Sequence, residues 1–130
     1  MSDEPRAGAV LYAKDMDRVV AFYAGARGFA TAGRDEEHVR LESPAFQLVV
    51  LRMPSRIASA IEIAVPPARR ANMPVKLVFF VPSIAAVRAS APALGGILNG
   101  AGKEWLFDGC KVCDGIDPEG NVIQLRERAG

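Results

Sequence analysis

The chain has 130 residues, of which 50% are hydrophobic and 24% charged, so its composition is that of one folded domain rather than a disordered chain. Its 16 basic and 15 acidic residues give a formal charge of +1, which argues against a surface for nucleic acid or for an anionic membrane. The single histidine, His38, excludes a His-rich metal site.

The beginning of the chain gives no sign of a targeting segment. Residues 1–7 are polar and acidic, and no apolar run follows them, so we expect no signal peptide. No stretch approaches the roughly 20 apolar residues of a membrane-spanning helix. With only 2 cysteines, a disulfide-rich secreted scaffold is not expected. We therefore expect a cytoplasmic protein that binds neither membrane nor nucleic acid.

The first half of the chain predicts a strand, a helix and three more strands. An apolar run begins at Ala9, and Asp15 follows it as a candidate N-cap. The helix is indicated by apolar residues at i, i+3, i+4 and i+7, namely Met16, Val19, Val20 and Tyr23. Gly28 is the expected helix exit. Short strands are predicted at residues 29–33, 38–42 and 46–52.

A connector at residues 54–74 follows this first half. It contains four prolines, Pro54, Pro66, Pro67 and Pro74, which disfavour a long helix or a central strand. Its residues 57–65 are apolar enough to hold a helical turn or a strand.

The second half repeats this pattern when the sequence is shifted by 68 positions, so that Leu77 falls on Ala9. The shift also places Ser83 on Asp15 and Gly96 on Gly28, which predicts a second capped helix with a glycine exit. Its apolar positions are Ile84, Val87, Ala91 and Leu94, and Pro92 should shorten its last turn. Strands are predicted at residues 97–98, 103–107, 111–113 and 122–126, with a type I turn over Asp-Pro-Glu-Gly at 117–120.

The sequence therefore predicts an α+β fold in which two tandem βαβββ modules, at about residues 7–53 and 75–127, form a single domain over residues 1–130. Strand parity gives several strands one entirely apolar face, and we expect these faces to pack against the helices. The opposite faces mix polar and apolar residues. Such a face fits either a small-molecule pocket or a solvent-exposed sheet.

The pattern resembles the vicinal oxygen chelate superfamily, which includes glyoxalase I, the extradiol dioxygenases and the bleomycin- and fosfomycin-resistance proteins. The resemblance rests on the strand-to-helix entry at residues 10–23 with its Phe22-Tyr23 pair, the Gly28-Phe29 exit, and the Asp-Pro-Glu-Gly-Asn turn at 117–121 that leads into the last strand. It covers nearly the whole chain. It implies two βαβββ modules that form a cupped mixed sheet, often completed in a homodimer.

The resemblance also implies where a metal would be held. Enzymes of the superfamily usually bind a divalent metal with His and Glu side chains on four strands, and the matching positions here are Gly8, Gln47, Lys76 and Gln124. Glycine offers no side-chain donor, glutamine offers only a neutral carbonyl oxygen, and lysine is a cation. We therefore predict no metal and no other cofactor.

The resulting prediction is a glyoxalase/bleomycin-resistance-like protein that binds an anionic or carbonyl-bearing small molecule without the usual metal. The expected ligand-binding residues are Tyr12, Gln47, Lys76, Trp105 and Gln124. Whether the chain is an enzyme stays open; if it is one, Lys76 is the candidate acid–base or imine-forming group.

Two alternatives to this prediction also stay open. The first is a metal-dependent lyase or dioxygenase with atypical ligands such as His38 or Glu42. The second is an interaction module with a vestigial cup. The sequence also does not decide whether the cup forms within one chain or across a homodimer.

Other candidate residues have simpler interpretations. Cys110 and Cys113 have CxxC spacing, but their odd separation places them on opposite faces of a strand and indicates two structural thiols. Asp114 is interpreted as a turn residue like Asp117. The Arg69-Arg70 step in the connector is interpreted as solvated.

Overall fold

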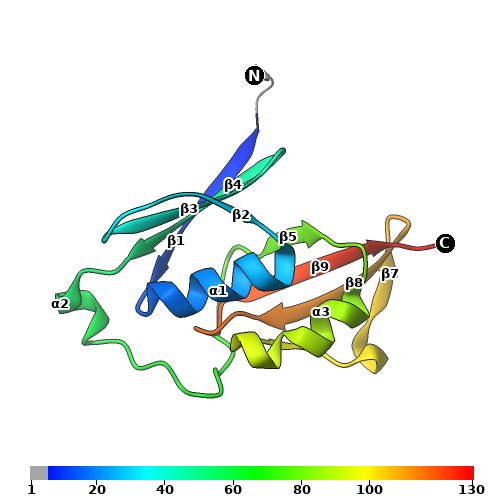
Figure 1. The fold of residues 1–130 in the computed structure, drawn as a ribbon. Coiled ribbons are helices and arrows are strands. Elements are labelled where there is room, and N and C mark those ends of the chain that lie inside the picture. The colour runs from blue at the N-terminus through cyan, green and yellow to red at the C-terminus, as the bar shows by residue number, and fades with distance from the viewer. Residues whose placement is uncertain (1–5) are drawn as a thin grey trace.

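The computed structural model describes residues 6–130 and contains two open sheets, each built by one half of the chain (Figure 1). The first half forms β1 (Ala7–Ala13), α1 (Met16–Arg27), β2 (Ala30–Arg34), β3 (His38–Ser43) and β4 (Phe46–Arg52). Its strands lie in the order β1-β4-β3-β2. β1 runs parallel to β4, and the other neighbours are antiparallel.

The second half builds a sheet of the same order, β5-β9-β8-β6, in which β5 and β9 are parallel and an additional strand, β7, pairs with β8. Its elements are β5 (Leu77–Phe80), α3 (Ile84–Ser90), the 3-10 turns η1 (Pro92–Leu94) and η2 (Ala101–Lys103), β6 (Ile97–Leu98), β7 (Trp105–Phe107), β8 (Cys110–Ile116) and β9 (Val122–Arg128). The predicted α+β class with two tandem βαβββ modules is confirmed. The repeat boundaries and the assignment of the whole chain to one domain stay predictions.

Only part of the expectation for the start of the chain can be followed in the structure, because residues 1–5 lie outside the described range. Within residues 6–130, none of the helices has the length and apolar character needed to cross a membrane.

The predicted ends of α1 are confirmed, whereas the predicted exit of the second helix is wrong. Asp15 accepts a hydrogen bond from Arg18 N at 3.1 Å, and Gly28 ends α1 with a left-handed φ of 79°. Pro92 stops α3 at Ser90 and starts η1, so the left-handed glycine is Gly95, with φ 87°, rather than Gly96. Gly96 is needed for a different reason: a Cβ there would lie 2.7 Å from Ile116 O and would clash with the Phe22 ring.

The apolar strand faces pack against the helices, as predicted. Leu48 and Val50 on β4 are fully buried, and Ile123 and Leu125 on β9 are nearly so. Phe79 on β5 links the two modules, since its ring packs edge-on against three rings of the first module, Tyr23, Phe29 and Phe46, with centroid distances of 5.6–5.9 Å. Such aromatic pairs contribute about 0.5–1.5 kcal/mol each beyond the apolar area that they bury.

The connector has little regular structure. Its helical turn is α2 (Ser55–Ala58), so the turn or strand predicted for residues 57–65 is limited to the end of α2. The connector is held at two points of the modules: Arg70 N donates to Gly120 O at 3.0 Å, and Lys14 Nζ donates to Ile61 O. It therefore passes beside the turn that leads into β9.

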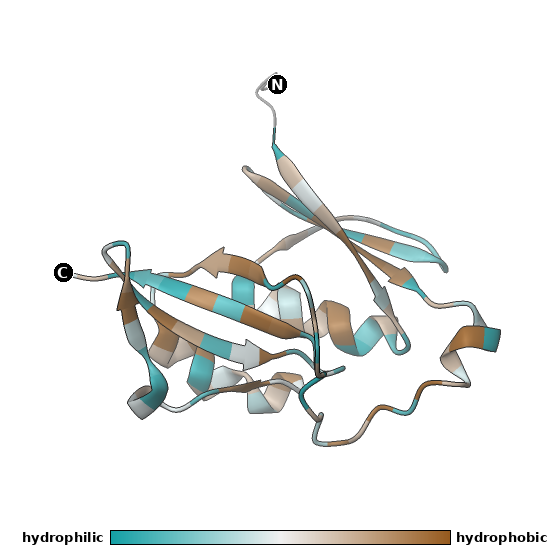
Figure 2. Cartoon of the chain, turned by 180° about the vertical axis from the view of Figure 1, so that it is seen from behind, coloured by the Kyte–Doolittle hydropathy of each residue, from teal (hydrophilic) through white to brown (hydrophobic). Residues whose placement is uncertain are grey.

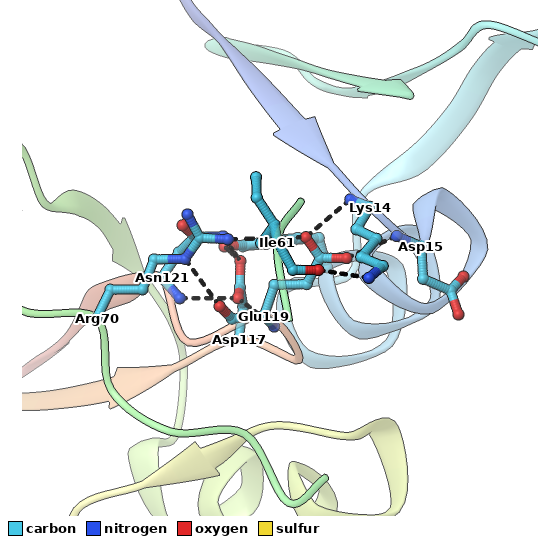
Figure 3. A network of polar contacts seen from close by, with 8 residues as sticks. Lys14, Asp15, Ile61, Arg70, Asp117, Glu119 and Asn121 are labelled. Carbon is cyan, nitrogen blue, oxygen red and sulfur yellow. Dashed lines mark hydrogen bonds and ion pairs between the residues drawn. The ribbon is translucent and has the colours of Figure 1, made fainter. Parts of the chain in front are cut away.

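A buried carboxylate organises this turn (Figure 3). One oxygen of Asp117 accepts the backbone N–H groups of Glu119 and Asn121 at 2.8 and 3.0 Å. The other accepts Asn121 Nδ2 and the hydroxyl of Tyr23, each at 2.8 Å. The predicted turn is confirmed by the bond from Gly120 N to Asp117 O. The Phe22-Tyr23 pair and the Asp-Pro-Glu-Gly-Asn turn, which carried the resemblance, therefore meet in space through Tyr23.

The turn also contacts the first module through Glu119. Its two carboxylate oxygens accept the backbone N–H groups of Lys14 and Asp15, at 2.9 and 2.7 Å. These groups lie between β1 and α1. The turn of the second module is thus bonded to both the beginning and the middle of α1.

We predict that Tyr23→Phe lowers the free energy of unfolding by about 1–3 kcal/mol, because the buried Asp117 carboxylate loses one of its four donors. Urea unfolding monitored by circular dichroism measures the change. Tyr12→Phe is the matched control, since Tyr12 is 56% exposed and its loss of a hydroxyl should leave stability unchanged. Equal stabilities of the two variants would contradict the role given to the Tyr23 bond.

Tyr23 also predicts a pH dependence. Burial, together with the charge and the hydrogen bond of Asp117, raises the pKa of Tyr23 well above its ordinary value of 10.0. Above about pH 10 the unfolded chain releases this proton while the folded chain keeps it, so the contribution is fully present below pH 10 and is lost as the pH rises toward the folded pKa. Between about pH 8.5 and about pH 11 the wild type should lose more stability than Tyr23→Phe, as measured by urea unfolding. Parallel losses would contradict this.

Candidate functional site

Each sheet has one face turned away from α1 and α3, and we call these the first and second outer faces. Figure 2 views the second sheet from the side opposite the helices and shows hydrophilic and hydrophobic residues mixed along the strands. On the first outer face, the register places Gly8, Val10 and Tyr12 of β1 beside Gln47, Val49 and Leu51 of β4. On the second, it places Val78 and Phe80 of β5 beside Gln124 and Arg126 of β9.

Four polar side chains form one connected chain on the second outer face. Lys76 Nζ donates to Asp114 Oδ2 at 3.0 Å, and Gln124 Nε2 donates to Asp114 Oδ1 at 3.2 Å. Arg126 Nε donates to Gln124 Oε1 at 2.9 Å. Asp114 and Gln124 are buried, whereas Lys76 is exposed and Arg126 is partly exposed. The buried pair therefore fixes two cations that remain accessible to a ligand.

Apolar rings surround the arginine end of this chain. The Arg126 guanidinium lies 5.1 Å from the Phe107 ring centroid and 5.8 Å from that of Phe80. Both rings are more than half exposed. Trp105, which is 41% exposed, pairs with Val112 across β7 and β8 and so lies on the same side of the sheet as Phe107. A few fixed polar groups among apolar walls are typical of small-molecule sites.

The first outer face carries a smaller polar group of the same kind. Glu42 accepts Gln47 Nε2 at 2.7 Å and Arg6 Nη2 at 3.2 Å. These hydrogen bonds, first from Gln47 and then from Arg6, lower the pKa of Glu42 below its ordinary value. Here too, a carboxylate on one strand holds an amide from the strand opposite and a cation that precedes the first strand of the module.

The two polar groups are not at equivalent positions. In the second sheet Val78 is opposite Gln124, and in the first Val10, which the repeat aligns with Val78, is opposite Val49. The register therefore makes Val49, and not Gln47, the counterpart of Gln124. The cation–carboxylate–amide group of the first module is displaced by two residues along its strands.

The structure brings together only some of the residues expected at the site. Lys76 and Gln124 are joined through Asp114, and Trp105 lies at the edge of the same face. Gln47 and Tyr12 lie on the first outer face. Over residues 6–130, no hydrogen bond or ion pair links Gln47 or Tyr12 to the polar chain of the second face.

A cavity of about 450 Å³ adjoins Lys76 where the connector passes the start of β9. Its lining residues are Arg69, Arg70, Ala71, Asn72, Met73, Val75, Lys76 and Val122. Three of these side chains are cationic and none is acidic. The Arg69-Arg70 step, interpreted from the sequence as solvated, therefore lines a cavity together with Lys76 of the polar chain.

Comparison with known proteins identifies the architecture. No family model matches the chain, and no curated protein sequence matches it. Among solved structures it is similar to a glyoxalase/bleomycin resistance protein/dioxygenase family enzyme from Burkholderia phytofirmans PsJN, with a TM-score of 0.70 and 18% identity over 92% of this chain and 95% of that one. The chain has the glyoxalase/bleomycin-resistance fold.

Two further structures support this fold. One is a glyoxalase-related enzyme from Fulvimarina pelagi, with a TM-score of 0.67 and 19% identity over 96% of this chain and 88% of that one. The other is a bleomycin resistance determinant encoded on the transposon Tn5, with a TM-score of 0.61 and 18% identity over 96% and 98%. The resemblance predicted from the sequence is confirmed at the level of the fold, and identities this low carry no information about the ligand.

The residues at the four positions that the sequence resemblance matched to metal ligands do not suit a divalent cation. A Cβ on Gly8 would lie 2.8 Å from Gln47 O, so the backbone leaves no room there for a ligating side chain. The carbonyl oxygen of Gln124 faces the guanidinium of Arg126, and the ammonium of Lys76 is bonded to Asp114. Both cations would repel a metal ion. Within residues 6–130, no three His, Cys, Asp or Glu side chains are grouped as metal ligands.

Sequence reasoning missed or misassigned several residues of this glyoxalase/bleomycin-resistance fold. Asp114 is not a turn residue, because it lies within β8, directly opposite Gln124. A short turn joins β8 to β9, so the residues on either side of it pair in order. The pairing of Asp114 with Gln124 could therefore have been predicted from the position of the turn at Asp117. Arg126 follows from strand parity, since it lies two residues after Gln124. The two cysteines do lie on opposite faces, with Cys113 fully buried in the core.

Proposed function

We propose that this protein binds an anionic or carbonyl-bearing small molecule on its second outer face, without a divalent metal. The observation that carries the proposal is the chain of bonds from Lys76 through Asp114 and Gln124 to Arg126. It presents two positive charges against the single negative charge of Asp114. The excess of positive charge beside exposed rings favours an anion or a polarised carbonyl with an apolar part.

Each residue of the chain has a distinct role in this proposal. Lys76 and Arg126 are the donors that contact the ligand, and Asp114 and Gln124 hold them in place from below. Because these hydrogen bonds already restrict the side chains of Lys76 and Arg126, the side chains lose less conformational entropy when a ligand binds. Phe107, Phe80 and Trp105 supply the apolar wall. Gln47 and Tyr12 would contribute only if the first outer face closes over the ligand.

The same geometry bears on catalysis. Lys76 is bonded as an ammonium to Asp114 at 3.0 Å, which suits the binding of an oxyanion or a carbonyl oxygen. Imine formation would instead require the neutral amine. The arrangement therefore favours binding over covalent chemistry, and Lys76 stays the candidate group if the protein is an enzyme.

We predict that Lys76→Met weakens ligand binding severalfold or more, since the ligand loses one of its two cationic donors. A panel of small carboxylates and 2-oxo acids can be screened by the fluorescence of Trp105, the one tryptophan in the chain. Lys111→Met is the matched control, because Lys111 pairs with Glu127 on the helix side of the same sheet. Unchanged affinity in Lys76→Met, or an equal loss in Lys111→Met, would refute the assignment.

The metal-dependent alternative can be separated from this proposal. A lyase or dioxygenase with atypical ligands should retain Ni, Zn, Mn or Fe through purification in an amount close to one ion per chain. Elemental analysis of the purified protein measures it. A stoichiometric metal would overturn the metal-independent proposal whatever the fluorescence titrations show.

We also propose that the protein is a homodimer. Support comes from exposed apolar side chains on both outer faces and on β7, including Val10, Tyr12, Phe80, Leu106 and Phe107. Exposed apolar surface of this extent often marks an interface. We predict that light scattering coupled to size-exclusion chromatography gives twice the mass of one chain at micromolar concentration. The mass of a single chain, unchanged on raising the concentration tenfold, would contradict the dimer.

A further inference from the structure

A buried donor without a partner lies at the wall of the cavity beside Lys76. Over residues 6–130, the Nη2 atom of Arg70 is buried and has no hydrogen-bond partner. Buried polar groups in native proteins are almost always paired, so the protein itself leaves Arg70 incompletely satisfied. The Nη2 atom is enclosed, whereas the Arg70 side chain as a whole is 31% exposed and lines the cavity. Arg27 Nε is the other such atom, but Arg27 stacks on the Phe29 ring and does not line this cavity.

The rest of the Arg70 side chain is fixed in place (Figure 3). Its Nε donates to Glu119 O at 3.0 Å, and its backbone N donates to Gly120 O at 3.0 Å. Nη2 lies 4.0 Å from Glu119 Oε1, which is beyond hydrogen-bond distance. The carboxylate oxygens of Glu119 are already bonded to the N–H groups of Lys14 and Asp15. The guanidinium is therefore held from one side, and the exposed part of the side chain lies at the cavity.

The charges around the cavity indicate the kind of partner that this donor would take. Arg69, Arg70 and Lys76 line it, and no acidic side chain does. Asp114 and Glu119 lie behind Lys76 and Arg70, and each is engaged in bonds of its own. Arg69 has no ion pair within residues 6–130. The cavity thus keeps a positive charge that is not neutralised, and a negatively charged ligand would be attracted.

The remaining walls limit the size and shape of the ligand. Met73, Val75 and Val122 add apolar side chains to the lining, and Asn72 adds a neutral amide. A volume of about 450 Å³ lies within the range of small-molecule sites. We propose that this cavity binds an oxyanion group, carboxylate or phosphate, of a small molecule with a short apolar part, with Arg69, Arg70 and Lys76 as its cationic donors.

The inference rests on the proposed function, because Lys76 belongs to both the cavity and the polar chain of the second face. It goes beyond that proposal by placing the charged end of the ligand at the connector. The apolar part would then extend along the second outer face toward Phe80. The connector, rather than the strands alone, would select ligands by charge.

Isothermal titration of the full chain with two separate probes, inorganic phosphate and hexanoate, tests the inference. We expect at least one probe to bind, and Arg70→Lys, which keeps the charge but loses the forked donors, to weaken binding roughly tenfold or more. Arg27→Lys is the matched control and should bind as the wild type does. Binding of phosphate alone identifies a phosphate group, and binding of hexanoate alone identifies a carboxylate with an apolar tail.

Two results would overturn the inference. One is that neither probe binds at about 10 mM, which corresponds to negligible affinity. The other is that Arg70→Lys binds as tightly as the wild type. If Arg70→Lys fails to fold, Arg69→Gln replaces it, because Arg69 makes no bond that the fold uses, and unchanged binding in that variant would overturn the inference equally. Binding that is lost in Lys76→Met but kept in Arg70→Lys would refute the connector site and leave the proposed function standing.

Discussion

The buried carboxylate of Asp117 is the constraint on which the rest of the fold depends. A carboxylate without partners in this position would cost several kcal/mol, and here four donors satisfy it. One of them, the Tyr23 hydroxyl, comes from the first module, so the charge is stable only when the two modules are packed together. The turn that Asp117 closes begins β9, and the register of β9 decides which of its side chains face the ligand side. A slip of one residue would move Gln124 and Arg126 to the helix side.

The C-terminal part of the chain also provides acceptors at the beginnings of α1 and α3. Free N–H groups at such points need acceptors, and a carboxylate there has a favourable interaction with the helix dipole. Glu119 accepts the N–H groups of Lys14 and Asp15 before α1, and Glu127 on β9 accepts Ile84 N at the start of α3 at 2.7 Å. Two acidic side chains from one segment thus anchor a helix in each module. Of these bonds, only those of Glu119 cross between the modules, and they add to the Tyr23–Asp117 bond in joining two sheets that share no strand.

The parts of the fold that could be predicted are those encoded by local pattern. The sequence signals for α1 are local: Asp15 marks its beginning, the apolar spacing marks its buried face, and Gly28 marks its end. The observed β4 matches its prediction at both ends. The glycine predicted to end the second helix was wrong by one residue, because Pro92 replaces the last helical turn with a 3-10 turn. The constant offset between the two repeats cannot predict such a local change. The entirely apolar faces could be predicted because successive side chains of a strand point to opposite faces, so a strand buried on one face has an apolar residue at every second position.

The candidate site could be predicted less well because it depends on pairings between distant segments. Lys76 and Gln124 were found through the resemblance, but their common partner Asp114 lies on a third strand. Arg70 is fixed by its bonds to Glu119 and Gly120, 49 residues away in the first case, and no pattern in the connector reveals them. The positions of such side chains depend on strand register and on the path of a loop. Neither can be predicted from the residues that are adjacent in the sequence.

The two outer faces explain why the site suits anions rather than metals. In each module the carboxylate nearest the site is neutralised by a cation of the same module, Glu42 by Arg6 and Asp114 by Lys76. The displacement by two residues keeps the two carboxylates out of equivalent positions, so they do not form the symmetric ligand set that a duplicated fold could offer. Arg126 then adds a positive charge on the second face, and the connector adds Arg69 and Arg70 beside it. Lys76 lies at a position that the resemblance matches to a metal ligand, and Arg126, Arg69 and Arg70 add further positive charge on the same side of the second sheet.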